Sequence, residues 1–435
     1  MTSSPSASRQ LRLGLFVQPL GHHVSGWRLT NDLGSPTDID WLIKIAQKAE
    51  SGLFDMFFVG DALATNVHRL PSTMARLEPL TLLSALAVST RHIGLAATAS
   101  TTFSDPFTLA RSFSSIDHIS RGRAAWNVVT SFSADVARNF SRDDMPAHAE
   151  RYAKAREFLE VSFKLWEAWE EGAVQPDAAS GRYFVDDKIK AIDHQGEHFQ
   201  VQGPLNITRS PQGRPVIIEA GSSEEGQALA AATAEVVFTA SASLEEGQAF
   251  YRSQKQKVKD AGRNPDHLLI LPGVMPIVGR TLEEAKATWK ELNSLVDIEN
   301  GLRQLSSRFG MDLSQFPLDG PVPEAPEGEG NKSRVKLFTD MAKRDNLTLR
   351  ELAAVAAGSR GHRVVVGTAE EIADDFQQWL EQEGADGFNI MPATMPEQLD
   401  LFIELVVPEL QRRGLFREEY QYHTLRENLG LPNYQ

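Results

Sequence analysis

The feature that most constrains the fold is the alternation of short apolar segments with amphipathic helical segments along almost the whole chain. Eight segments have the length and composition of buried strands. They are Leu13–Val17, Phe54–Val59, His92–Ala97, Ala124–Val129, Pro215–Ala220, Glu235–Thr239, a stretch within Leu268–Val278, and Gly387–Met391. Strands that alternate with helices form a parallel sheet, and eight such units predict an α/β fold of the closed (β/α)8 TIM-barrel type.

Helix-start signals support this alternation. Asp105-Pro106 has the residue types preferred at the N-cap and first position of a helix. Four S/T-x-x-E spacings predict capped helices in the second half. They are Ser222/Glu225, Ser243/Glu246, Thr281/Glu284 and Thr368/Glu371.

The predicted domain organisation is one barrel with two insertions. Residues 1–10 are Ser-rich and predict a disordered tail, and residues 11–435 predict the barrel. The insertions lie at about 172–213 and 300–361, and the first contains a possible hairpin at His194–Phe199. Long insertions in compact domains are often lids, so we expect the second to cover the barrel mouth.

Composition excludes several functions. The formal net charge of −14 argues against a nucleic-acid partner, which needs a basic surface. The chain has no cysteine, which removes thiol nucleophiles, iron–sulfur clusters and disulfides, and fits a reducing, cytoplasmic setting. No apolar run approaches the ~20 residues that a membrane helix needs, so no membrane association is expected.

The carboxyl ends of the predicted strands nominate the site, because barrel active sites gather there. The candidates at these ends are His22, His23, Asp61, Thr98, Asn127, Ser222 and Ser223. The adjacent imidazoles of His22 and His23 would point apart, so no metal site is expected. One of them is expected to line a pocket and the other to lie in solvent.

Three common catalytic or nucleotide-binding motifs are missing from the sequence. It contains no G-x-S-x-G, no G-x-G-x-x-G and no P-loop motif. The remaining neutral donors and acceptors suit a planar polar heterocycle with a phosphate tail. Gly221-Ser222-Ser223, which leads into a helix near Glu224, offers hydroxyls, backbone N–H groups and a helix N-terminus to a phosphate.

Structural roles remain open for the same residues. Ser222 either caps its helix or binds the phosphate, and Ser223, off the cap position, is the freer donor. Asp61 either lines the site, caps a loop or pairs with Arg69, and Asn127 either lines the site or satisfies a turn. Tyr152 either lines the site or is a core residue. His148 either lines the site or is a solvated loop residue.

Segments along nearly the whole chain carry a family resemblance. Among them are Ala97–Thr102, Arg121–Ser131, Arg209–Gly213, Ala220–Ser223 and Gly384–Phe388. Together they resemble the bacterial-luciferase-like flavin-dependent monooxygenases, in the branch of nitrilotriacetate and dibenzothiophene-sulfone monooxygenases. Arg121 departs from the pattern, since relatives often have a glycine there.

The resemblance implies a cofactor and a reaction. FMN would act as FMNH2, with O2 as co-substrate, and a C4a-peroxyflavin would transfer one oxygen atom to a small organic substrate. The implied flavin neighbours are Asp61, Thr98, Asn127, His148, Tyr152, Ser222 and Ser223. His148 and Tyr152 are four residues apart, so a helix would place both on one face.

The resemblance also implies partners. Because no NAD(P)H motif is present, an NAD(P)H-dependent flavin reductase is expected to supply FMNH2, and a homodimer or homotetramer is expected. His22 or His23 is the candidate proton donor near the peroxide. Two alternatives remain: an F420-dependent dehydrogenase on the same barrel, and a non-catalytic flavin-binding protein. The sequence does not identify the substrate.

Overall fold

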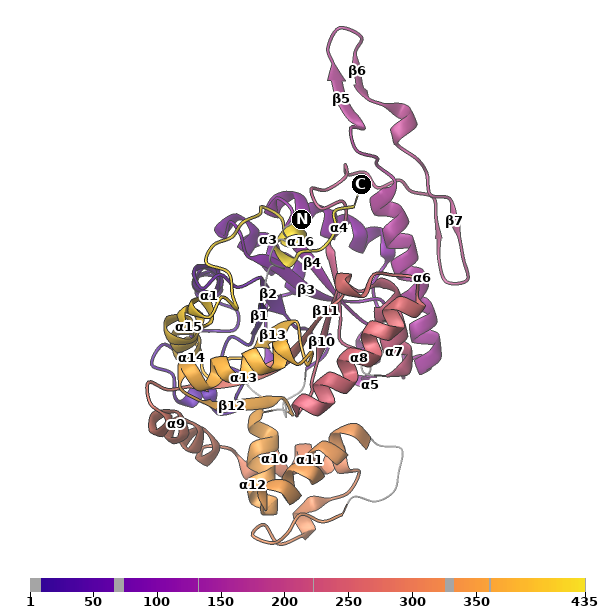
Figure 1. The fold of residues 1–435 in the computed structure, drawn as a ribbon. Helices are drawn as coiled ribbons and strands as arrows, with labels where there is room; N and C mark the ends of the chain where they lie inside the picture. Colours follow the sequence, from indigo (N-terminus) through magenta and orange to yellow (C-terminus); the bar gives the residue numbers. More distant parts are fainter. Residues whose placement is uncertain are drawn as a thin grey trace.

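A ring of eight parallel strands forms the centre of the molecule (Figure 1). The computed structural model describes residues 9–65, 74–131, 133–221, 223–324, 332–359 and 361–434. In ring order the strands are β1 (Arg12–Val17), β2 (Met56–Val59), β3 (Gly94–Ser100), β4 (Ala124–Val129), β9 (Val216–Glu219), β10 (Val236–Thr239), β11 (Leu269–Val278) and β13 (Gly387–Ile390). β1 pairs with both β2 and β13, which closes the ring and confirms the predicted barrel.

Helices cover the outside of the ring. They are α1 (Ile39–Ser51), α3 (Pro79–Ser89), α4 (Pro106–Ser120), α5 (Ala134–Asn139), α6 (His148–Glu167), α7 (Glu224–Thr233), α8 (Leu244–Asp260), α9 (Leu282–Ser294), α13 (Ala369–Glu381), α14 (Glu397–Leu401) and α15 (Val407–Arg412), with a π-helical turn at Phe402–Val406. Asp105, Ser243, Thr281 and Thr368 are N-caps, as predicted. None of the described helices is long and apolar enough to cross a bilayer.

One strand, β12 (Arg363–Gly367), was not predicted. It pairs in parallel with Val274–Val278 of β11, outside the ring. β11 has ten residues, so its first part pairs with β10 and its last part extends to β12. The sequence of β12, RVVVG, is a strong strand signal that was overlooked because it directly follows the second insertion.

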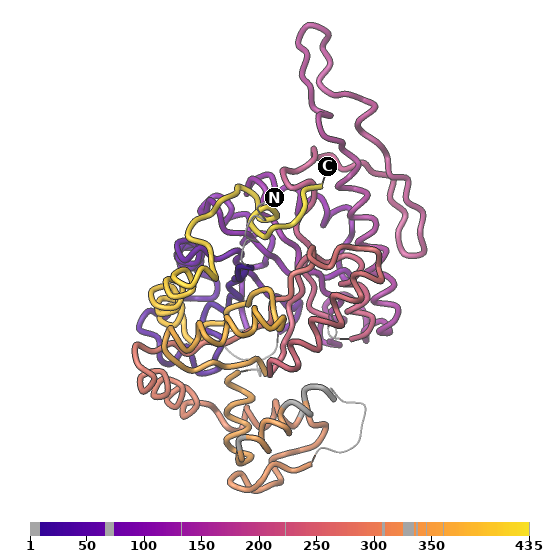
Figure 2. The backbone as a smooth tube through the Cα atoms, in the orientation of Figure 1, coloured from indigo at the N-terminus to yellow at the C-terminus, as the bar shows by residue number. Residues whose placement is uncertain are grey.

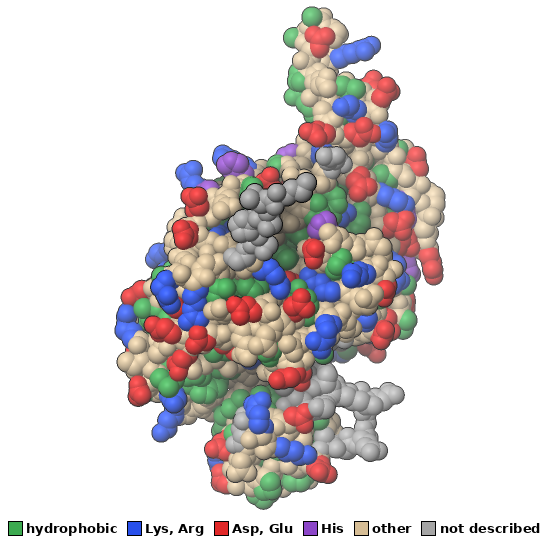
Figure 3. Space-filling view, in the orientation of Figure 1, with side chains coloured by type: hydrophobic (Ala, Val, Ile, Leu, Met, Phe, Trp, Pro, Cys, Tyr) green, Lys and Arg blue, Asp and Glu red, His purple; other side chains and the backbone are tan. Residues whose placement is uncertain are grey.

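The first insertion forms two antiparallel hairpins. β5 (Val174–Asp177) pairs with β6 (Arg182–Phe184) and projects from the body (Figures 1 and 2). β7 (His194–Gln195) pairs with β8 (Gln200–Val201), which confirms the predicted hairpin there. Figure 3 shows hydrophobic side chains on the projecting hairpin, where Tyr183 is 57% exposed.

The second insertion is helical rather than a long loop. α10 (Ile298–Phe309), α11 (Lys332–Asp345) and α12 (Leu349–Ser359) pack around a core of their own. We call residues 298–359 the helical segment. It lies at the end of the barrel opposite the two termini (Figure 1).

The C-terminal residues fill the end of the barrel where the strands begin. Side chains at alternate positions of the strands form the interior. Leu425 and Leu429 of α16 (Leu425–Leu429), and Leu431 just after the helix, pack against them. A Cβ at Gly94 would lie 2.5 Å from the Leu425 side chain, so this strand start requires glycine. At the other terminus, residues 1–8 of the predicted tail lie outside the described residues, whereas Arg9 pairs with Asp386 at 2.7 Å.

A buried ion pair holds the C-terminal segment in place. Arg426 is fully buried, and its guanidinium bonds both carboxylate oxygens of Glu235, at 2.5 and 3.1 Å. The Tyr434 hydroxyl donates a third bond to Glu235, at 2.6 Å. Burial alone would raise the pKa of Glu235, but Arg426 and its other partners lower it below its usual value.

Replacing Arg426 should therefore destabilise the whole barrel. Arg426→Gln leaves the Glu235 carboxylate buried without its countercharge, and we expect a loss of about 3–5 kcal/mol of unfolding free energy. Arg280 is the matched control, because its pair with Glu404 is more than half exposed. Arg280→Gln should cost less than about 1 kcal/mol. Urea unfolding measures both, and equal losses would contradict the assigned role of Arg426.

Candidate active site

Two polar side chains face each other inside the barrel mouth, where β3 and β4 end. Thr98 and Asn127 are register partners on these strands, so both point to the interior. Asn127 Nδ2 donates to Thr98 Oγ1 at 2.7 Å, and Thr98 donates to the Val59 carbonyl at 2.8 Å. Asn127 Oδ1 is buried and has no hydrogen-bond partner among the described residues. The site thus contains an oriented acceptor that is available to a ligand.

Further hydroxyls and backbone carbonyls follow Thr98 and Asn127 at the carboxyl ends of β3 and β4, and together they form a polar wall of the mouth. Ser100 and Ser131 share a hydrogen bond at 2.9 Å. Arg151, at the start of α6, donates to the Ser131 carbonyl, and Lys154 donates to the Thr102 carbonyl at 2.9 Å. These bonds fix the N-terminal part of α6 over the ends of β3 and β4.

The structure brings His148 and Tyr152 together on α6, as their spacing predicted. Their rings lie 4.8 Å apart, and His148 Nδ1 lies 3.7 Å from Glu225 Oε2 on α7. The Tyr152 hydroxyl lies against Gly226, where a Cβ would be only 3.0 Å from it. α6 and the N-terminus of α7 therefore form a second polar wall beside the mouth.

The loop before α7 corrects one expectation. Ser223, and not Ser222, is the N-cap: its Oγ accepts the Gly226 N–H at 3.1 Å. Ser222 itself lies outside the described residues. A Cβ at Gly221 would lie 2.8 Å from the Gly226 Cα, so this loop folds tightly against the first turn of the helix. The remaining N–H groups of that turn form an anion-binding end.

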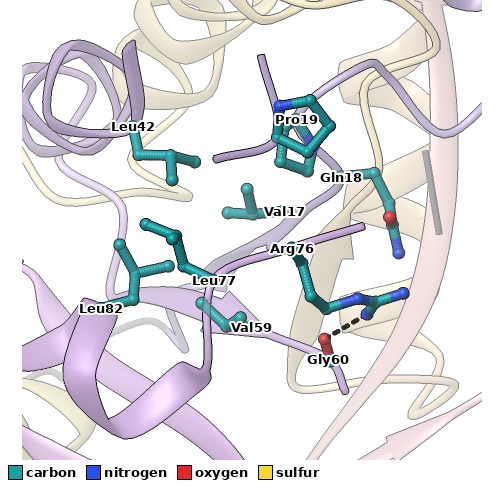
Figure 4. A pocket seen from close by; sticks show the side chains of 10 residues that line it. Val17, Gln18, Pro19, Leu42, Val59, Gly60, Arg76, Leu77 and Leu82 are labelled. Carbon is teal, nitrogen blue, oxygen red and sulfur yellow. Dashed lines mark hydrogen bonds between the residues drawn. The ribbon is translucent and has the colours of Figure 1, made fainter. Parts of the chain in front are cut away.

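Asp61 belongs to an ion pair at the end of β2. Its carboxylate lies 3.8 Å from Arg76 Nε, and Arg76 also donates to the Gly60 carbonyl at 2.6 Å (Figure 4). The alternative partner Arg69 lies outside the described residues. The sequence pointed to an ion pair for Asp61 but did not identify Arg76, which is 15 residues away. An apolar cavity adjoins this pair, lined by residues that include Val17 and Leu82.

His22 and His23 are both buried, each only 1% exposed, so the expectation that one lies in solvent is wrong. His22 Nε2 lies 2.7 Å from the Phe16 carbonyl, which can only accept, so Nε2 carries the proton. His23 Nδ1 instead accepts the Ser25 N–H at 3.1 Å. Since His23 also packs against Trp289 at 5.6 Å, it is the more structural of the two.

An aromatic cluster lines the other half of the mouth and was missed by sequence reasoning. Phe16 contacts Phe58 at 5.0 Å and Phe238 at 5.4 Å, and His22 lies 4.8 Å from Phe16. Phe16 and Phe58 are register partners on β1 and β2. The period-2 alternation of these strands was the signal that could have found them.

Comparison with known proteins now adds to this geometry. A family model described as luciferase-like monooxygenase matches residues 21–387. The chain belongs to this family. The expected fold and the expected enzyme class, a flavin-dependent monooxygenase, are thereby confirmed.

Individual members of the family align over nearly their full length. An N-acetyl-S-(2-succino)cysteine monooxygenase of Bacillus subtilis (strain 168) is 48% identical, with 98% of each chain covered. Nitrilotriacetate monooxygenase component A of Aminobacter aminovorans is 47% identical, covering 98% of this chain and 97% of the relative. A solved riboflavin lyase with modified FMN is 32% identical, with a TM-score of 0.83 over 98% of this chain and 96% of that one.

Glu219 has a buried carboxyl and lies two residues before Gly221, where the tight loop begins. It is 3% exposed at the end of β9 and accepts the Thr233 hydroxyl at 2.6 Å. Burial raises the pKa of Glu219 to about 8, although Thr233 and Arg263 partly oppose the shift. Glu219 is therefore protonated in the folded protein at neutral pH.

This raised pKa makes stability depend on pH. The folded state binds a proton that the unfolded chain has released above about pH 4.5, so unfolding free energy falls as pH rises toward 8 and then levels off. Glu219→Gln removes this contribution. The Tm of the variant minus the Tm of the wild type should therefore be roughly 2–5 °C larger at pH 9 than at pH 6. Thermal unfolding across pH measures it. The exposed Glu291→Gln should show no such trend, and a pH-independent difference for Glu219→Gln would contradict the assignment.

Proposed function

We propose that the chain binds FMN, as FMNH2, across the barrel mouth and uses it with O2 to oxygenate a small organic substrate. The observation that carries this proposal is Asn127 Oδ1, a buried acceptor held by Thr98 and without a partner in the described protein. An isoalloxazine edge offers ring N–H donors to such an acceptor.

The second polar wall fits the rest of the cofactor. The N-terminus of α7 and the tight Gly221 loop present backbone N–H groups to a phosphate. The Ser223 hydroxyl hydrogen and the Tyr152 hydroxyl add donors there, and His148 lies beside Tyr152. The structure of the riboflavin lyase with modified FMN supports this choice of cofactor.

Reduced FMN would supply the redox chemistry with O2, and the chain's residues would position it. Asn127 and Thr98 would orient the ring, while the aromatic side chains, of which Phe58 is buried and Phe16 and Phe238 are partly buried, would exclude water from it. His22 and His23 are the proposed proton donors; the ring proton of His22 is donated to the Phe16 carbonyl, so His22 would first have to take up a second proton at Nδ1. The identity of the oxygenating flavin species remains a prediction.

Two relatives support a proposal for the substrate class. The two proteins at 48% and 47% identity are named for a succinated cysteine and for nitrilotriacetate. Both molecules have a sulfur or nitrogen atom with carboxylate-bearing arms. We propose a small heteroatom-containing carboxylic acid of this kind as substrate.

The proposed partner is a separate NAD(P)H-dependent flavin reductase. The name of the nitrilotriacetate relative, component A, supports a system of more than one protein. A homodimer or homotetramer and a cytoplasmic location remain predictions from the sequence.

The reductase requirement gives a direct test of function. With NADH, FMN, O2 and an added reductase, the protein should oxygenate N-acetyl-S-(2-succino)cysteine or nitrilotriacetate, and 18O2 should label the product by one atom. The same mixture without reductase should give none, because the chain has no NAD(P)H motif. Rapid NADH oxidation by the protein alone, or turnover with F420 in place of FMNH2, would refute the proposal.

Asn127 tests the flavin position. Asn127→Ala removes the oriented acceptor, and we expect the Kd for FMNH2 to rise about tenfold, which corresponds to one buried hydrogen bond. Anaerobic titration followed by flavin absorbance measures the change, with Tm recorded for each protein. Asn206→Ala is the control, since Asn206 is exposed and lies outside the mouth. An unchanged Kd in Asn127→Ala would place the flavin elsewhere.

A further inference from the structure

A cavity of about 770 Å³ lies at the end of the barrel where the strands begin, opposite the mouth. Two chain segments form most of its wall: residues 87–92, which lead into β3, and residues 119–123, which lead into β4. The exposed His423 of the C-terminal segment also lines it. The cavity has the volume of a small-molecule pocket, and the proposed flavin and substrate sites do not use it.

This cavity is rich in cationic side chains although the chain as a whole is acidic. Arg91, Arg121 and Arg123 line it together with His92 and His423, and none of the described residues in its lining is an aspartate or glutamate. The chain has a formal net charge of −14, and three other cavities of the described structure each include at least two carboxylates in their lining. The positive charge is therefore a local feature of this cavity.

Arg123 is the fixed centre of the cationic cluster. Its side chain is 2% exposed, and all five N–H groups of its guanidinium are used in hydrogen bonds of 2.7–3.1 Å. The acceptors are the Thr90 hydroxyl and the carbonyls of Ala87, Thr90, Ile93 and Ser120. Neutral groups at the C-terminal ends of α3 and α4, and not a carboxylate, thus bind most of this buried guanidinium.

The negative groups around the cluster do not balance its charge. The Glu50 carboxylate accepts the backbone N–H groups of residues 91–93 at 2.6–3.0 Å, and the two helix ends contribute about half a negative charge each. Against three guanidiniums, this leaves an excess of about one positive charge. The exposed Arg91 and Arg121 form no ion pair within the described part of the chain. Burial lowers the pKa of Arg123 to about 10, and the charge of Arg121 adds a smaller lowering.

Arg121 reaches the cavity from a backbone conformation that favours glycine. It is the C-cap of α4 and has a φ of +61° and a ψ of +45°, which costs a residue with a Cβ about 1 kcal/mol. The bonds of this cap run from the Arg121 backbone N–H to the carbonyls of Asp117 and His118. The hydrogen bonds of the cap therefore do not use the arginine side chain, which lines the cavity instead.

Two apolar side chains lie in the same lining as the exposed arginines. Val88 is 76% exposed and Ile119 is 45% exposed. A ligand that fills the cavity and covers both of them has an apolar or aromatic part in addition to its anionic group.

We propose that this cavity binds an organic phosphate. Arg91 and Arg121 bind the phosphate oxygens, because the planar guanidinium matches them with paired hydrogen bonds. Val88 and Ile119 contact the organic part. Arg123, whose N–H groups are all used, adds charge and holds the two wall segments together without touching the ligand. The proposal does not depend on the proposed function, since the cavity lies at the end of the barrel opposite Asn127.

Calorimetric titration of the whole protein with ADP and with pyrophosphate tests this proposal. FMN is kept at saturation in 0.15 M KCl, so that the anion-binding end of α7 is occupied. We expect one ADP per chain, with a Kd at least threefold lower than that of pyrophosphate. The two probes have similar charge, and only ADP has an organic part to cover Val88 and Ile119. Absence of saturable ADP binding, or equal affinities for the two probes, overturns the inference.

Arg121→Gly tests the position of the site without endangering the fold, because glycine adopts this φ without strain. We expect the Kd for ADP to rise about tenfold, as for the loss of one charge-assisted contact, with Tm maintained and the Kd for FMNH2 changed less than about twofold. Arg91→Gln should weaken ADP binding in the same direction.

Arg111→Gln is the matched control, since it removes one exposed positive charge from α4 outside the cavity. Its Kd for ADP should equal that of the wild type. An unchanged Kd in Arg121→Gly, or an equal rise in Arg111→Gln, overturns the inference, because ADP would then lie elsewhere or be attracted by net charge alone.

A hexaglutamate peptide distinguishes a small ligand from an acidic segment of another protein. It should displace ADP less well than pyrophosphate does, because the arginines lie in a cavity sized for a small molecule. Displacement by the peptide at lower concentrations than by pyrophosphate assigns the cavity to a protein partner and overturns the inference. Oxygenation with the added reductase is measured separately, so failure of the proposed function is distinguishable from failure of this site.

Discussion

Because the eight strands of the ring all run in parallel, every one of them ends on the same side of the barrel. Closure therefore gathers residues from distant parts of the sequence at one mouth. Thr98 and Asn127 meet there across a single strand pairing, while Phe16 and Phe238 meet across the barrel although 222 residues separate them. The site is a consequence of ring closure, and each side chain in it depends on strand register.

The two ends of the barrel differ in how their buried polar side chains are bonded. At the end where strands begin, buried ion pairs fix the C-terminal segment: Arg426 with Glu235, and Arg417 with Asp55. Their carboxylates also accept backbone N–H groups, from Ile217 and Leu13. Breaking either pair would leave a buried charge without its countercharge, which is strongly destabilising. At the mouth, by contrast, Asn127 retains an acceptor without a partner among the described residues. The carboxylates at the first end are thus occupied by protein donors, whereas the Asn127 oxygen at the mouth is left for a ligand.

Sequence patterns predicted the part of this structure that is local or periodic. Apolar runs located all eight strands of the ring, and the four-residue spacing placed His148 beside Tyr152. Contacts set by tertiary packing could not be read in this way. By residue type, either of the two adjacent serines before α7 could be its N-cap. In the structure Ser223 is the N-cap, and Gly221 packs closely against Gly226 in the first turn of the helix. The position of His362 depends equally on Gly273 of another strand, because a Cβ there would lie 2.7 Å from its ring, and no local pattern reveals this.

The long strand β11 has a consequence for how such enzymes diversify. Its last part pairs with β12 rather than with the ring, and the whole helical segment is inserted between these two paired strands. Residues can thus be added, removed or replaced within the segment while both of its attachment points stay fixed on neighbouring strands. In this arrangement the helical segment can vary in length and sequence while the barrel strand β11 and its neighbour β12 keep their positions.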